Sequence, residues 1–111
     1  MRGDVKAQAI LYAPKMEQFF RRRNVTRDVV LREKARMKEL YPNVSRYDIT
    51  DVQVESHKEN VAVVSFRKEW DMHGERRFSG SDRQRFKLRK IAGDWKIVGE
   101  EEMVVYWVRR G

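Results

Sequence analysis

Apolar and polar residues follow two different spacings along the chain, and the change falls near Pro42. Before Pro42, apolar residues recur at intervals typical of helices, whereas after it they alternate with a period of two, which is typical of strands. Pro14 suits the first turn of a helix, so residues 13–23 are predicted as a short helix. Met16, Phe19 and Phe20 form the apolar side of this predicted helix.

A second helix is predicted over residues 26–41, in the stretch "TRDVVLREKARMKELY". Thr26 is a plausible N-cap, and Asp28 lies in the first turn, where a negative charge complements the helix dipole. Val30, Lys34, Met37 and Tyr41 follow helical spacing, which gives a narrow apolar face. Pro42 then ends the helix.

Four strands are expected after Pro42, in residues 45–57, 61–72, 83–92 and 95–108. In the first of these, the parity of the apolar residues changes near Thr50 and Asp51, which indicates a β-bulge. Helices that precede a run of strands are typical of the α+β class. We therefore predict two or three N-terminal helices packed on a curved, four-stranded antiparallel meander, in a single domain over residues 1–111.

The stretch "RQRFKLRKIAGDWKIVGEEEM" carries five basic residues among its first eight and then three consecutive glutamates. We predict a hairpin with Gly93-Asp94 at the centre of a type II′ turn. Phe86, Leu88, Trp95 and Ile97 then share the buried face. On the other face the predicted register places Lys87 opposite Glu100, and Arg85 opposite Glu102. Opposite charges across a ladder stabilise it, so this basic arm is expected to carry its own counter-charges.

Composition narrows the range of functions. The net charge is +8 with 38% charged residues, which favours contact with polyanions without specifying one. There is no cysteine, which excludes disulfides and thiol chemistry, and the only histidines are His57 and His73, so no metal site is predicted. No cofactor is expected. No apolar run reaches the roughly 20 residues of a membrane span, and no targeting segment is visible, so the compartment stays open.

Several segments together resemble the nuclear transport factor two-like superfamily. "GDWKIVGEE", preceded by "RQRFKLRKI", is similar to its closing hairpin, "VAVVSFRKEW" to the preceding strand, and "LYAPKMEQFF" to its short second helix. The resemblance covers roughly Tyr12 to Val108 and is closest to bacterial accessory domains. It implies a cone-shaped α+β fold, the fold of ketosteroid isomerase, scytalone dehydratase and polyketide cyclases.

The family usually opens with a long helix that closes the mouth of the cone, but only about a dozen residues precede Tyr12 here. We therefore expect a first helix that is short, missing or supplied by a partner, and a domain that could belong to a larger protein. Uncovered apolar sheet would favour a homodimer, with Val104 and Trp107 in its interface.

No residue set matches a catalytic pattern of the family. Asp71 and His73 are the best free candidates for acid–base chemistry, although a solvated turn explains them better. Tyr12, Tyr47 and Tyr106 could also donate a proton inside a pocket, although tyrosines packed in the core explain them better. The expected ligand pocket is lined by aromatic residues: Tyr12, Phe66, Trp70, Trp95 and Tyr106.

Three functions remain open. We favour a non-enzymatic accessory domain that dimerises or binds a small molecule or peptide through the concave face of its sheet. The first alternative is a small enzyme of the isomerase, cyclase or dehydratase type. The second is a nucleic-acid-binding module, which would need a continuous patch of Arg76, Arg77, Arg83 and Arg89 with the arginines of 21–23.

Overall fold

The computed structural model describes residues 9–111, which form one helix and a six-stranded sheet. The strands are β1 (Lys15–Phe19), β2 (Arg22–Thr26), β3 (Asn43–Lys58), β4 (Val61–His73), β5 (Arg77–Ile91) and β6 (Asp94–Arg110), and the helix is α2 (Arg27–Leu40). Their order across the sheet is β2-β1-β6-β5-β4-β3. The last four strands form the predicted antiparallel meander.

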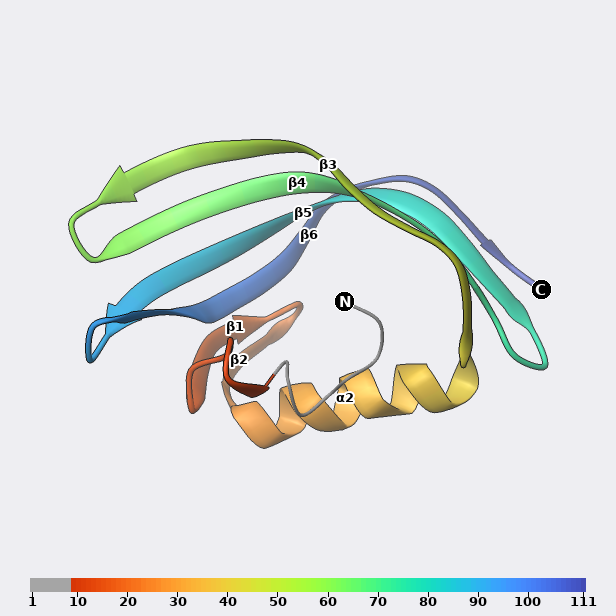
Figure 1. Cartoon of the computed structure of the whole chain (residues 1–111), viewed down its shortest axis with the longest axis horizontal. Helices are drawn as coiled ribbons and strands as arrows, with labels where there is room; N and C mark the ends of the chain where they lie inside the picture. Colours follow the sequence, from red (N-terminus) through yellow and green to blue (C-terminus); the bar gives the residue numbers. More distant parts are fainter. Residues whose placement is uncertain (1–8) are drawn as a thin grey trace.

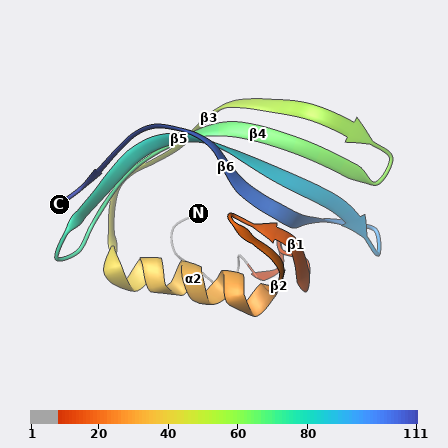
Figure 2. The same cartoon turned by 180° about the vertical axis from the view of Figure 1, so that it is seen from behind.

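The four long strands have 13 to 17 residues each and curve strongly along their length. As Figures 1 and 2 show from opposite sides, α2 runs beneath the concave face of this arch and the β1–β2 hairpin lies at one end of the helix. The architecture is therefore a cone with the sheet as one wall and α2 opposite it. We call the face of the sheet turned towards α2 the concave face, and the other the outer face.

The main hydrophobic core lies where the hairpin, the helix and the base of β6 meet. Met16 and Val30 are fully buried there, and Tyr12, Phe19 and Ile97 pack with them. Burial of these side chains holds the β1–β2 hairpin and the first turns of α2 against the concave face. Farther along, Tyr41 at the end of α2 meets Phe78 of β5 with ring centroids 5.4 Å apart.

The predicted helix over residues 13–23 is wrong, because this segment forms most of the β1–β2 hairpin. Phe20 adopts a positive φ of 55° in the tight turn, and Asn24 adopts the same value opposite Glu17, the one pair missing from an otherwise constant register. Pairing with β6 outweighs the local helical spacing, since Gln18 and Phe19 align in parallel with Gly99 and Glu100. The prediction of two or three helices is corrected accordingly to one helix in the described residues, and the four strands become six.

The helix predicted over residues 26–41 is confirmed as Arg27–Leu40, with Thr26 at the N-cap position and Asp28 in the first turn. The Thr26 side chain makes no capping hydrogen bond with the described residues, however. The bulge predicted in β3 is also confirmed. The register shifts between Thr50 and Gln53, and Asp51 has a positive φ of 49°.

The last hairpin differs from its prediction by one residue at the turn and by three register shifts along β6. Ala92 and Gly93 form the turn, with φ of 51° and 86°, as a type I′ turn requires. Leu88 pairs with Ile97, but Lys87 pairs with Gly99, so one extra residue of β6 is accommodated between them. This bulge reverses the parity of Gly99 to Glu102, so the predicted pairs of Lys87 with Glu100 and Arg85 with Glu102 do not form. Two further register shifts, at Met103 and Tyr106, change the parity again beyond this point.

Candidate active site on the concave face

The bulge before Gly99 turns two of the three consecutive glutamates towards the concave face. Glu101 pairs with Arg85 and bonds to its guanidinium on the outer face, whereas Glu100 pairs with Phe86 on the concave face. Glu100 is buried and accepts a 2.8 Å hydrogen bond from the Tyr12 hydroxyl. Its other oxygen lies 3.4 Å from Lys34 Nζ of α2.

The Tyr12–Glu100–Lys34 group is a fixed anchor between sheet and helix. Burial raises the pKa of Tyr12 far above its usual range, and the charge of Glu100 adds to this effect. A tyrosine in this state keeps its proton, so it is a permanent hydrogen-bond donor to Glu100. The buried carboxylate is satisfied by one neutral and one cationic donor, as a buried charge requires.

Asp82 and Glu102 form a second acidic group on the same face. Asp82 is 1% exposed, and its Oδ2 accepts a 3.1 Å hydrogen bond from the Gln84 amide. A hydrogen bond with Asp82 is the largest influence on Glu102, followed by desolvation and the repulsion between the two charges, and together they raise the pKa of Glu102 to about 7. Glu102 therefore keeps its proton to a higher pH than an ordinary glutamate does.

Lys68 and Tyr47 line the concave face beside these acids. Lys68 is paired with Asp82 across the β4–β5 ladder and lies over the ring of Trp70, 4.9 Å from its centroid. Burial lowers the pKa of Lys68, and the nearby carboxylates oppose that shift. The pKa of Tyr47 is raised by burial first and then by the charges of Glu100 and Asp82.

Two buried polar atoms at this place have no partner in the described residues. They are Oδ1 of Asp82 and Nε1 of Trp70. Buried polar groups in native proteins are nearly always hydrogen-bonded, so an unpartnered acceptor and donor call for a bound water or ligand. Trp70 is fixed in place because it packs against Gly80, where an added Cβ would come within 2.5 Å of its ring.

The sequence-predicted acid–base candidates lie elsewhere. Asp71 accepts two hydrogen bonds from Arg77, at 2.8 and 2.6 Å, and this contact lowers the pKa of Asp71. His73 bonds to Ser45 at 3.1 Å. Both contacts belong to the β4–β5 turn region, away from the carboxylate pair, and explain these residues as structural.

The predicted pocket residues divide between three places. Tyr12, Phe66 and Trp70 are buried on the concave face. Trp95 is 39% exposed at the far tip of the last hairpin, where its ring lies 5.9 Å from that of His57. Tyr106 lies on the outer face beneath the guanidinium of Arg67, 4.6 Å from the ring centroid. The structure thus places only the first three on the concave face.

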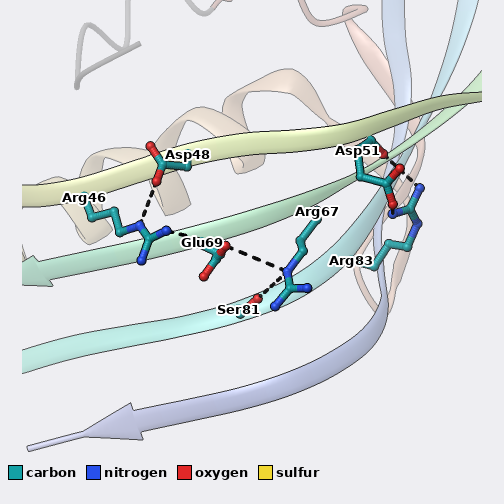
Figure 3. A network of polar contacts seen from close by, with 7 residues as sticks. All are labelled: Arg46, Asp48, Asp51, Arg67, Glu69, Ser81 and Arg83. Carbon is teal, nitrogen blue, oxygen red and sulfur yellow. Dashed lines mark hydrogen bonds and ion pairs between the residues drawn. The ribbon is translucent and has the colours of Figure 1, made fainter.

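The outer face is covered by ion pairs, several of which Figure 3 shows with α2 behind the sheet. Arg46 contacts Asp48 and Glu69, Arg67 contacts Glu69, and Arg83 contacts both Asp51 and Ser65. Farther along, Lys87 and Arg89 share Glu17 of β1. The basic arm of β5 is therefore neutralised, as expected, but its partners are Glu17, Glu55 and Glu101.

These pairs also bear on the predicted polyanion patch. Arg77, Arg83 and Arg89 are each paired with a carboxylate, namely Asp71, Asp51 and Glu17. Arg77 and Arg89 lie at opposite ends of β5, about 40 Å apart at the usual rise per residue. The four arginines therefore do not gather into one patch with those of 21–23.

A hollow of about 430 Å³ lies at the C-terminal end of the sheet, and its lining includes Arg46, Asp71, Arg77, Trp107 and Arg109. Asp82 and Glu102 do not line it, but Trp70 does, so the hollow adjoins the candidate active site through Trp70. No group of three or more metal-ligand side chains in the described residues is arranged to hold a metal ion. None of the described helices is long and apolar enough to cross a membrane.

No protein-family model matches the sequence, and no curated protein matches it significantly. Solved structures do match. A protein of Novosphingobium aromaticivorans provisionally named an aromatic ring hydroxylase superposes with a TM-score of 0.81 at 11% identity, over 97% of this chain and 79% of that one. A provisionally named scytalone dehydratase of the same organism gives 0.76 at 12% identity, over 96% and 74%.

An NTF2-like protein of unknown function in nutrient uptake from Rhodospirillum rubrum gives a TM-score of 0.70 at 25% identity, over 93% of this chain and 86% of that one. These matches confirm the fold that the sequence resemblance implied. The names of these structures include both enzymes and proteins of unknown function. The fold therefore does not identify an activity, which has to be inferred from the residues of this chain.

Proposed function

We propose that this chain, which has the nuclear transport factor two-like fold, is a small acid–base enzyme of the dehydratase or isomerase type. The observation that carries the proposal is the Asp82–Glu102 pair, in which a hydrogen bond and close negative charge raise the pKa of Glu102 to about 7. A general acid or base works best when its pKa lies near the working pH. This proposal replaces the accessory domain that the sequence favoured, because the sequence had not revealed the pair.

The chemistry suited to this pair is proton removal from carbon next to a carbonyl, or loss of water from a hydroxyl. In the singly protonated pair, the ionised carboxylate accepts a proton from the substrate and the protonated one donates to a leaving or carbonyl oxygen. The ammonium of Lys68 and the hydroxyl of Tyr47 lie on the same face and can stabilise a developing oxyanion. The Tyr12–Glu100–Lys34 anchor keeps the wall of the site rigid.

The test measures deuterium incorporation next to the carbonyl of small cyclic and aryl ketones in D₂O by NMR. We expect exchange above background with the wild-type chain. Both Asp82→Asn and Glu102→Gln should reduce its rate about 100-fold, the scale of one general acid–base group. Asp71→Asn is the matched control, because it removes a carboxylate that is held by Arg77 on the outer face.

The outcomes separate the rival functions. Exchange that survives Asp82→Asn would contradict the proposed role of the pair. Saturable ketone binding without exchange in the wild-type chain would instead support the non-enzymatic reading, a binding domain in which the unpartnered Asp82 Oδ1 and Trp70 Nε1 hold a polar ligand.

A further inference from the structure

The hollow at the C-terminal end of the sheet is built on a row of residues that are paired across four strands. In order from β3 to β6, this row consists of Arg46, Asp71, Ser79 and Arg109. Residues directly opposite in a ladder point to the same face, and Figure 3 shows Arg46 on the outer face, with α2 behind the sheet. Strands lie about 4.8 Å apart, so the row has an arginine at each end, with backbones about 14 Å apart, and small Ser79 between them leaves space.

The lining of this hollow carries more positive than negative side chains. Its arginines are Arg46, Arg77, Arg109 and Arg110, and its carboxylates are Glu69 and Asp71. Both carboxylates are already engaged, since Glu69 lies 3.6 Å from Arg46 and Asp71 accepts two hydrogen bonds from Arg77. The excess positive charge is therefore available to a molecule that enters the hollow.

Arg109 and Ser79, which are neighbours in the row, keep unused hydrogen-bond donors. Among the described residues, the contact of the Arg109 guanidinium is with the ring of Trp107 and not with a carboxylate. Ser79 is 5% exposed, and its hydroxyl makes no hydrogen bond within the described part of the chain. Buried hydroxyls ordinarily have a partner, and guanidinium groups bind carboxylate and phosphate oxygens strongly. This pair of donors is therefore suited to an oxyanion.

Trp107 provides an aromatic surface beside these donors. It lies opposite Ser81 in the β5–β6 ladder and is 42% exposed. Trp107 and Arg109 are two residues apart in one strand, so they share a face, and the guanidinium lies 5.9 Å from the centroid of the indole. Aromatic rings stack well against such a pair. The volume of about 430 Å³ is also within the range of small-molecule sites.

We propose that this hollow binds a small anion that carries an aromatic ring. Its carboxylate or phosphate group lies between Arg109, Ser79 and Arg77, and its ring packs against Trp107. Arg77 can take part because Asp71 holds it through Nε and Nη2, which leaves Nη1 for the anion. The site is on the outer face, so it is independent of the activity proposed for the concave face.

An NMR titration of the full chain with phenyl phosphate and with benzoate tests the site directly. The chain has three tryptophans, and the indole N–H signal of Trp107 is identified by its absence in Trp107→Phe. We expect this signal to shift saturably with a dissociation constant below about 1 mM, and the probe that binds more tightly identifies the anionic group. The signal of Trp95, at the far tip of the last hairpin, should not move.

Two variants separate the parts of the site. Arg109→Gln should raise the dissociation constant of phenyl phosphate at least about tenfold, because a charged donor is lost. Trp107→Leu should weaken the binding of phenyl phosphate and leave that of inorganic phosphate unchanged. Arg22→Gln removes the same charge from an exposed arginine of β2. It is the matched control and should bind phenyl phosphate as the wild-type chain does.

Three outcomes would overturn the proposal. The first is the absence of a saturable shift of the Trp107 signal with either probe. The second is an equal loss of affinity in Arg22→Gln and Arg109→Gln, which would indicate only a general attraction of anions to a basic chain. The third is loss of binding in Glu102→Gln, because it would place the probe on the concave face instead.

Discussion

Asp82 and Glu102 have opposite relations to solvent, and this difference matters for their roles. Asp82 is almost fully buried in the middle of β5, whereas Glu102 lies towards the open part of the concave face. Glu102 is therefore the member of the pair that solvent can reach. The raised pKa of this single residue should be visible in the pH dependence of the stability of the chain.

The folded chain holds the Glu102 proton up to about pH 7, whereas the unfolded chain loses it near 4.5. Between these pH values the folded state binds more protons, so the contribution of Glu102 to stability falls as the pH rises. Glu102→Gln cannot ionise. We therefore expect the variant to gain about 4 °C in Tm over the wild-type chain at pH 8 and to show little difference at pH 4.

Thermal unfolding of both proteins across this pH range gives the measurement. The comparison between variants cancels the contributions of Glu17 and Asp71, whose pKa values are lowered by arginine partners. Glu39→Gln, at an exposed position in α2, is the control. A constant difference between Glu102→Gln and the wild-type chain at every pH would count against a raised pKa.

At the scale of elements, the β1–β2 hairpin is the part that sequence patterns described least well. Its five-residue strands carry helix-compatible spacing, and their strand conformation depends on contacts with β6 that are distant in sequence. The long strands and α2, in contrast, carry enough regular alternation to be predicted locally. Short elements that are stabilised by tertiary pairing are the ones for which local pattern fails.

The hairpin contributes the centre of the core, so its loss should be costly. Met16 in β1 is fully buried against Tyr12, Phe19 and Val30. Met16→Ala should lower the free energy of unfolding by about 2–5 kcal/mol, through lost burial and the cavity left behind. Leu40→Ala, at a position that is 48% exposed, should cost less than about 1 kcal/mol. Urea unfolding measures both, and equal costs would contradict the placement of the core.

At the scale of the whole molecule, the net charge of +8 is distributed unevenly. Some surfaces pair their basic side chains with carboxylates, and others do not. The outer face of the sheet is largely neutralised by cross-strand ion pairs. Exposed arginines that have no such partner among the described residues are found on the β2 hairpin arm, at Arg22 and Arg23. The uncompensated positive charge is therefore not concentrated on β5, although the sequence is most basic there.

Glu17 gives a way to test this distribution, since it neutralises both Lys87 and Arg89. Glu17→Gln should tighten non-specific binding to a labelled DNA duplex and steepen its salt dependence, by about one to two units of logarithmic slope for two released cations. Glu33→Gln removes the same charge from an exposed pair in α2 and should change the slope by at most about one unit. Fluorescence anisotropy at several salt concentrations measures both; tight binding by the wild-type chain would contradict the neutralised face.

The fold could be predicted from the order of the segments, but the candidate site could not. The sequence did contain one signal of the site: Lys68 interrupts an otherwise apolar face, between Phe66 and Trp70. Glu100 and Glu102 were assigned to the outer face because strict alternation from Ile97 places Gly99 and Glu101 inside. One extra residue in β6 reverses that assignment, and no local pattern marks which residue is extra.

The run Glu100–Glu102 can tolerate a change in the parity of β6. Because three acidic residues stand in succession, a strand in either parity directs at least one carboxylate to each face. An insertion or deletion of one residue before the run would exchange the outward and inward glutamates without leaving either surface devoid of acid. Such a change would turn Glu102 away from Asp82 and Glu101 away from Arg85, but it would leave an acidic residue on each face.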